Sequence, residues 1–174
     1  DLGGGDLSFE TGGRLRLLSG GTLDQTLYIP NQSSPNDHST GLELVEGETL
    51  TFTGAFEVPR VYEYGGFEIQ PFNQGAGLTT VIMDNVYFGY FDLYLLGDGP
   101  DGNGAAEHEW VGVRGGLRKL ACGNDTFAGS QITFGDGCDF SANWFDIVGT
   151  NAMVSITGNA DIRTGNELRF VHGN

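Results

Sequence analysis

The residues best suited to chemistry lie in one glycine-rich stretch, LGDGPDGNGAAEHEW, residues 96 to 110. Calcium binds about six to eight oxygen atoms in a flexible cage, and a turn-rich loop can supply them from acidic side chains and backbone carbonyls. The spacing does not fit the ligand positions of an EF-hand. A solvated turn, which uses the same residue types, is the alternative interpretation. The stretch predicts a calcium site with the ligands Asp98, Asp101, Asn103 and Glu107.

Catalytic motifs are absent from the sequence. It contains no Gly-x-Ser-x-Gly elbow, no phosphate-binding loop and no dinucleotide fingerprint. A glycosidase needs two carboxylates that face one cleft. Glu63 and Glu68 lie among aromatic residues, but their strand parity is opposite. We therefore assign no catalytic residues.

Cys122 and Cys138 bracket the segment CGNDTFAGSQITFGDGC. Zinc binding is not indicated, because the three His residues show no ligand spacing. Two free buried thiols are one interpretation. A Cys122–Cys138 disulfide is the interpretation we favour, because the composition is that of a secreted protein.

Several other side chains are candidates for contact with sugars. Trp110 and Trp144 could stack on a glycan, as amphipathic aromatic side chains do. Asn31 and Asn124 each begin an Asn-x-Ser/Thr tripeptide in an expected loop, where a glycan could be attached.

The charge of the chain limits its partners. The 174 residues include 23 acidic side chains against seven Arg and one Lys, for a formal net charge of −15. Such a surface repels nucleic acid and anionic lipid, so neither is expected as a partner. No run of about 18 apolar residues occurs, so we expect no insertion into a membrane. The acidic, glycine-rich composition favours a secreted protein at the extracellular cell surface.

Hydrophobic residues alternate with polar ones in several short runs, which predicts β-strands with one solvated face. Residues 13–20 and 48–58 are examples, as are 153–158 and 167–173. The segment at residues 79–96 is apolar on both faces, and we expect it to form two central strands that bend near Gly89. No stretch has helical periodicity, and we find no repeat of 20 residues or more.

These patterns predict an all-β fold, a two-layer antiparallel β-sandwich of about a dozen short strands, of jelly-roll type. We expect a single sandwich domain at residues 12–174. Residues 1–11 form a glycine-rich segment before it, whose apolar side chains could complete their own sheet or add a strand to a neighbour. The candidate strand-donor residues are Leu2, Leu7 and Phe9.

Three functions fit these features. The first is a secreted, non-enzymatic structural or adhesive subunit that assembles with copies of itself into a filament, sheath, surface layer or matrix. The second is a calcium-assisted carbohydrate-binding module, which would have an extracellular glycan as its partner. The third is a glycan-active enzyme. The missing catalytic motifs favour the first function.

Overall fold

The fold is known from a computed structural model, which describes residues 5–30, 39–58, 66–72, 77–97, 105–123, 129–149 and 152–171. These residues form 18 strands and no helix. The described part of the chain thus contains no helix that could cross a membrane. The all-β prediction is confirmed.

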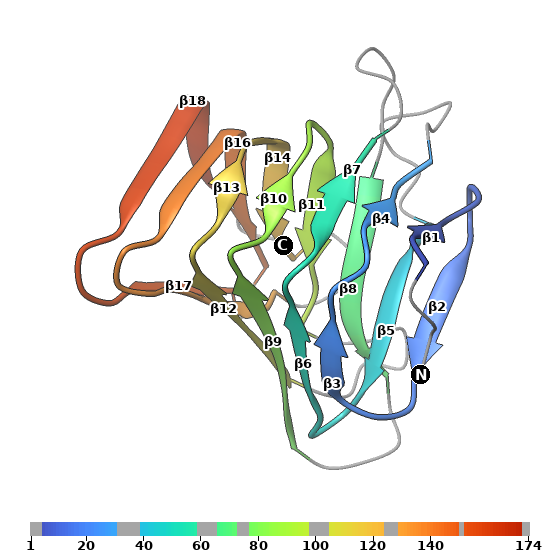
Figure 1. Ribbon diagram of the computed structural model, residues 1–174. Coiled ribbons are helices and arrows are strands. Elements are labelled where there is room, and N and C mark those ends of the chain that lie inside the picture. The colour runs from blue at the N-terminus through green and yellow to red at the C-terminus, as the bar shows by residue number, and fades with distance from the viewer. Residues whose placement is uncertain are drawn as a thin grey trace.

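The prediction of an antiparallel jelly-roll sandwich is wrong. Every strand pair within the three sheets is parallel, and the chain winds into a β-solenoid of about five turns (Figure 1). Each strand is followed along the chain by a strand of another sheet, so its hydrogen-bonded neighbours come from the coils before and after it. The period-two pattern is the same for parallel and antiparallel strands, which is why it did not distinguish the two arrangements.

The three sheets are named A, B and C. Sheet A contains β1 (Leu7–Ser8), β4 (Leu27–Tyr28), β7 (Ala55–Glu57), β10 (Tyr87–Phe88) and β13 (Arg114–Gly115). Sheet B contains β2 (Arg14–Leu17), β5 (Gly41–Val45), β8 (Gly66–Phe72), β11 (Asp92–Leu95), β14 (Leu117–Cys122), β16 (Asp139–Val148) and β18 (Asp161–Val171). Sheet C contains β3 (Gly21–Leu23), β6 (Thr49–Phe52), β9 (Leu78–Asp84), β12 (Ala105–Val111), β15 (Gln131–Phe134) and β17 (Met153–Ile156).

A structural repeat is present, contrary to the sequence-based expectation. Arg16 lies beside Glu43 and Glu43 beside Gln70, and the members of each pair are 27 positions apart in the sequence. Near the other end, Asp146 lies beside Arg169, only 23 residues later. Because the coils differ in length and in the residues at matching positions, the repeat leaves no fixed period in the sequence.

Tight corners divide segments that the sequence pattern predicts to be single strands. Residues 48–58 form β6 and β7, with Gly54 between them. A Cβ atom on Gly54 would lie 2.2 Å from the carbonyl oxygen of Gln25 in the preceding coil. Only glycine lets the two corners stack this closely.

The doubly apolar segment at residues 79–96 forms three strands rather than two. They are β9, β10 and β11, and each belongs to a different sheet. All four residues of β11 are buried, as are six of the seven in β8. Burial on both faces is typical of parallel sheets, so this signal was available in the sequence.

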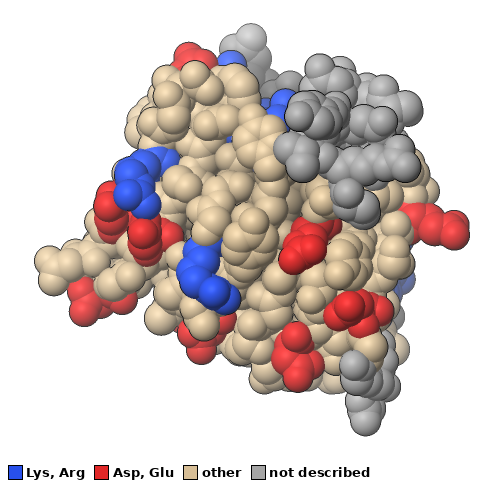
Figure 2. All heavy atoms as spheres, turned by 45° about the horizontal axis from the view of Figure 1, so that its top comes forward, with Lys and Arg blue, Asp and Glu red and all other residues tan. Residues whose placement is uncertain are grey.

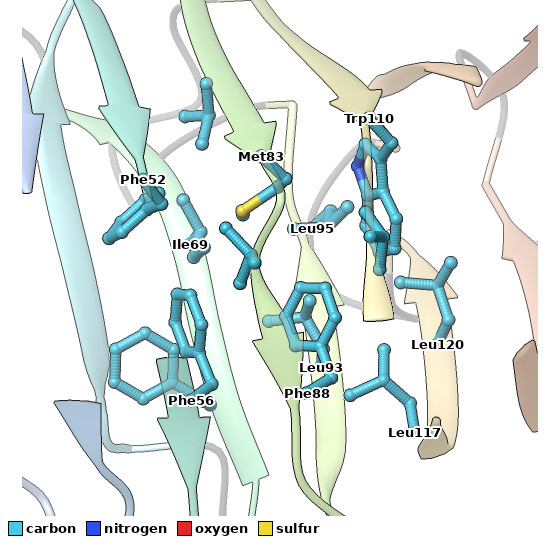
Figure 3. Packing of buried hydrophobic residues seen from close by; sticks show 14 of the residues in the cluster. Phe52, Phe56, Ile69, Met83, Phe88, Leu93, Leu95, Trp110, Leu117 and Leu120 are labelled. Carbon is cyan, nitrogen blue, oxygen red and sulfur yellow. The ribbon is translucent and has the colours of Figure 1, made fainter. Parts of the chain in front are cut away.

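The three sheets enclose a continuous apolar core (Figure 3). Phe88 stacks on Phe56 at a ring-centroid distance of 5.3 Å and on Trp110 at 5.4 Å. Phe88 and Phe91 both lie in this core, since each is at most 1% exposed. Aromatic rings from successive coils therefore form one stack along the interior.

The predicted disulfide is wrong: Cys122 and Cys138 are both free and buried. Cys122 is paired with Ile147 near the end of β16, whereas Cys138 directly precedes that strand. Nine residues of extended chain separate the two positions by roughly 30 Å, at about 3.3 Å per residue. A disulfide requires Cα atoms within about 7 Å.

Candidate functional site

Ion pairs between neighbouring coils line the outer face of sheet B. Arg16 and Glu43 approach to 2.7 Å, Lys119 and Asp146 to 3.0 Å. Most pairs join side chains from adjacent strands of the sheet. We call this set the ion-pair ladder; its members are Arg14–Glu68, Arg16–Glu43, Arg118–Asp92, Lys119–Asp146 and Arg169–Asp146.

Burial dominates the electrostatics of the ladder. Glu68, Asp92 and Asp146 are each at most 2% exposed. Burial raises the pKa of Glu68, although hydrogen bonding to Arg14 opposes it, and raises the pKa of Asp92 to about 6 against the attraction of Arg118 and Lys119. Burial also acts to raise the pKa of Asp146, but hydrogen bonds from Arg169 and Lys119 outweigh it and the pKa falls. These carboxylates are already bound by cations, so the ladder holds the coils together.

The ladder concentrates the basic residues of the chain in one sheet. Of the eight Lys and Arg residues, six lie on strands of sheet B: Arg14, Arg16, Arg118, Lys119, Arg163 and Arg169. Figure 2 shows basic side chains beside acidic ones, and other acidic side chains alone on uncharged surface. The excess negative charge is therefore spread over the surface outside sheet B.

His108 lies inside the solenoid. It is fully buried on β12, between Val81 and Ile132 of the adjacent strands. Burial lowers its pKa to about 3, because the charged imidazolium is disfavoured away from water. Neither ring nitrogen has a hydrogen-bond partner in the described part of the chain. His108 is therefore a neutral core residue.

The C-terminal end of the solenoid is open and apolar. β17 and β18 are the last strands of sheets C and B. A pocket of about 540 Å³ opens between them, and its lining is almost entirely apolar. Four large side chains of this end remain 49–70% exposed: Met153, Ile156, Leu168 and Phe170. We call this surface the open end.

The predicted calcium ligands are only partly placed. Asp98, Asp101 and Asn103 lie outside the described residues. Glu107 is half-buried on β12, where its carboxylate accepts a hydrogen bond from the Thr133 hydroxyl at 3.3 Å. No group of three or more His, Cys, Asp or Glu that could hold a metal occurs among the residues described. Calcium binding by residues 98–107 stays a prediction.

The two tryptophans have different environments. Trp110 is fully buried and packs edge-on against Phe140, with ring centroids 4.7 Å apart, so no face of its ring is open to a glycan. Trp144 is half-buried, in register with Lys119 and Glu167 on the neighbouring strands. The sequence pattern gave no sign of this difference.

The candidate strand-donor residues lie on their own chain. Leu7 donates a backbone hydrogen bond to Thr26 at 2.9 Å, and Phe9 donates one to Tyr28 at 3.0 Å. The Phe9 ring also packs edge-on against Phe67, with centroids 5.1 Å apart. β1 thus begins sheet A of the same molecule. Leu2 lies outside the described residues, as do the two sequon residues Asn31 and Asn124.

Sequence reasoning missed both the ladder and the open end. The ladder had a weak signal, because Arg16 and Glu43 carry opposite charges at a spacing that recurs between Glu43 and Gln70. The open end had none, because alternation in residues 153–158 and 167–173 predicts strands without showing which edge lacks a neighbour.

Comparison with known proteins gives no match. No protein-family model matches the chain. No curated protein and no solved structure is significantly similar to it. Function is therefore argued from the geometry of the chain.

Proposed function

We propose that this protein is a secreted, non-enzymatic structural or adhesive subunit of an extracellular assembly, whose copies associate through the open end. The observation that carries the proposal is the exposure of Leu168 (50%) and Phe170 (70%) beside the apolar pocket. Burying such a side chain fully contributes about 1.5–3 kcal/mol relative to leaving it in water. Contiguous exposed apolar surface of this kind typically marks an interaction site.

Backbone geometry adds to this argument. β17 and β18 are edge strands, and an edge strand presents peptide groups that can pair with another strand. A second copy offers an end with the same sheet arrangement and the same apolar side chains. It can therefore bury the apolar surface and extend the sheets at once.

Charge directs the association to this end. The chain carries a net charge of −15, so two copies repel each other over most of their surfaces. β18 is an exception, since its two acidic side chains, Asp161 and Glu167, are balanced by Arg163 and Arg169. The neutral strand lies at the apolar end, where repulsion between copies is weakest.

Composition supports the extracellular setting, with one Lys in 174 residues and 30 glycines in a turn-rich chain. The carbohydrate-binding alternative loses one of its two aromatic residues, because Trp110 lies in the core. A structural role needs no catalytic group. The buried carboxylates of sheet B are consistent with such a role, because they are bound in ion pairs.

Sedimentation velocity over a range of concentrations tests the proposal. The wild type should associate, and the double variant Leu168→Asp, Phe170→Asp should remain monomeric, because charges at the open end cannot be buried without cost. Leu78→Asp is the matched control: Leu78 is 45% exposed on β9, away from the open end. A wild type that is monomeric at every concentration, or a double variant that associates normally, would refute the proposal.

A further inference from the structure

We infer that two copies join through β18, which pairs antiparallel with β18 of the second copy about a two-fold axis at Gly165. This inference rests on the proposed association through the open end and specifies its geometry. β18 is the last strand of sheet B (Figure 1). Nine of its eleven residues are exposed. Antiparallel pairing of the two edges would join the two B sheets into one.

The sequence of β18 is complementary to its own reverse. With Gly165 on the axis, each acidic residue faces a basic residue of the second copy, and each large apolar residue between them faces another apolar residue. The opposed pairs are Asp161–Arg169, Ile162–Leu168, Arg163–Glu167 and Thr164–Asn166. Opposite charges directly across an antiparallel pair are stabilising, whereas like charges are destabilising.

Neighbouring registers lack this complementarity. A shift by two residues is the smallest that keeps every side chain on its face. In one direction it places Arg163 opposite Arg169, and in the other it places Asp161 opposite Glu167. A shift by four residues places Glu167 or Arg163 opposite its own copy. Among these registers, only the one centred on Gly165 pairs opposite charges.

The backbone presents the correct groups for this pairing. The Asp161 amide donates to Cys138 at 2.8 Å, and the Val171 carbonyl accepts from Gly149 at 3.1 Å, so these odd-numbered residues bond toward β16. The register of β18 with β16 shifts between Thr164 and Glu167, but the odd-numbered residues bond toward β16 at both ends of the strand. Peptide groups of adjacent residues point in opposite directions, so those of Ile162 and Phe170 point to the outer edge. Ile162–Leu168 and Thr164–Asn166 would then be the hydrogen-bonded pairs with the second copy. The charged residues would occupy the non-hydrogen-bonded positions, where Cα atoms are about 4.5 Å apart and side chains are closest.

The two faces of β18 also fit the arrangement. Ile162 lies beside Phe140, and Leu168 beside Phe145, so both face the interior. The charged residues alternate with them and face outward, where Arg163 is 58% and Glu167 54% exposed. Pairing about Gly165 would set Ile162 against Leu168 of the second copy and thus cover both pockets, while the ion pairs remain at the outer surface.

Head-to-tail stacking is the competing arrangement, and charge disfavours it. One row of residues runs across sheet B from Arg14 at the first strand to Arg169 at the last. A copy added in the same row would place its Arg14 beside Arg169. The two-fold arrangement instead brings Asp161 of the second copy to Arg169.

Cysteine cross-linking tests the pairing. Arg163→Cys and Glu167→Cys are prepared separately and oxidised alone or mixed. The mixture should form disulfide-linked dimers at least about tenfold more than either variant alone, because residue 163 opposes residue 167 but lies about 13 Å from residue 163 of the second copy. The native Cys122 and Cys138 are buried and should remain unmodified. Equal cross-linking in all samples, or none in the mixture, would overturn the inference.

Charge reversal gives an independent test. Arg163→Glu alone and Glu167→Arg alone each create like-charge pairs at two symmetric positions, and should associate at least about tenfold more weakly. Mixing the two variants restores both ion pairs, so heterodimers should form. If both variants associate like the wild type while Leu168→Asp, Phe170→Asp does not, the β18 pairing is wrong and the proposed function stands. If the wild type does not associate, both are wrong.

Discussion

Arg169 binds Asp146 through two hydrogen bonds, of 2.8 Å from Nε and 2.6 Å from Nη2, and so fastens the last strand of sheet B to the coil before it. On its other side, the Asp146 carboxylate forms an ion pair with the Lys119 ammonium group, at 3.0 Å. One nearly inaccessible carboxylate thus joins three successive strands. The open end is held in shape by this contact, although its outer edge has no neighbour among the described strands.

Asp146→Asn should lower the free energy of unfolding by about 2–4 kcal/mol, since it removes the buried charge that both cations face. Asp139→Asn is the control, because Asp139 is 64% exposed in its ion pair with Arg163. An exposed pair contributes about 0–1 kcal/mol. Urea denaturation measures both variants, and equal losses would contradict the importance of burial in the ladder.

His108→Leu should change how stability depends on pH. The folded-state pKa is about 3, below the ordinary 6.5, so the unfolded chain binds a proton that the folded chain excludes. The wild type should therefore lose about 1.4 kcal/mol per pH unit relative to the variant as the pH falls below 6.5. The variant should also be more stable at neutral pH, because two buried nitrogens without partners are removed. Parallel stability profiles from pH 7 to pH 4 would show that His108 is hydrated or protonated in the fold.

Asp92 should titrate near pH 6 in the folded protein, above its ordinary 3.8. A raised carboxyl pKa means that the folded state binds the proton more tightly, so this contribution favours folding at low pH and is lost as the pH rises from about 3.8 to 6. Carbon-13 NMR of the carboxyl group gives the pKa directly. A midpoint at or below 4 would mean that Arg118 outweighs burial.

Deletion of residues 1–11 should lower the melting temperature and leave association intact. The segment contributes the backbone hydrogen bonds of Leu7 and Phe9 and the contact of Phe9 with Phe67. Thermal melting and size-exclusion chromatography separate the two effects. A stable, folded monomer that no longer associates would instead indicate that this segment reaches a neighbouring copy.

The sequence predicted which side chains of a strand face inward, but it did not predict how the strands are connected into sheets. Alternation in residues 14–17 correctly placed Leu15 and Leu17 inward and Arg14 and Arg16 outward. The same alternation cannot tell whether the next strand along the chain returns beside the first or passes into another sheet. Coil lengths that range from 20 residues (Leu7 to Leu27) to 32 (Ala55 to Tyr87) then concealed the repeat.

The site was less readable for a different reason. Asp98 and its neighbours attract attention because acidic residues in a glycine-rich loop resemble a calcium site, whereas Leu168 and Phe170 look like any half-buried strand. What distinguishes the latter is the lack of a following strand among those described, which is a property of the fold. The reverse complementarity of residues 161–169 was visible in the sequence, but it gains meaning only when β18 is known to be an edge.

Small-angle X-ray scattering over a concentration series tests the central claim most directly. Sheet B has seven strands, so two copies joined through β18 form one sheet of fourteen strands, roughly 62 Å long at about 4.8 Å per strand. We expect a discrete dimer with this elongated shape, which does not grow further as the concentration rises. A monomer at every concentration would contradict association through the open end, and a polymer that lengthens steadily would contradict the two-fold pairing at Gly165.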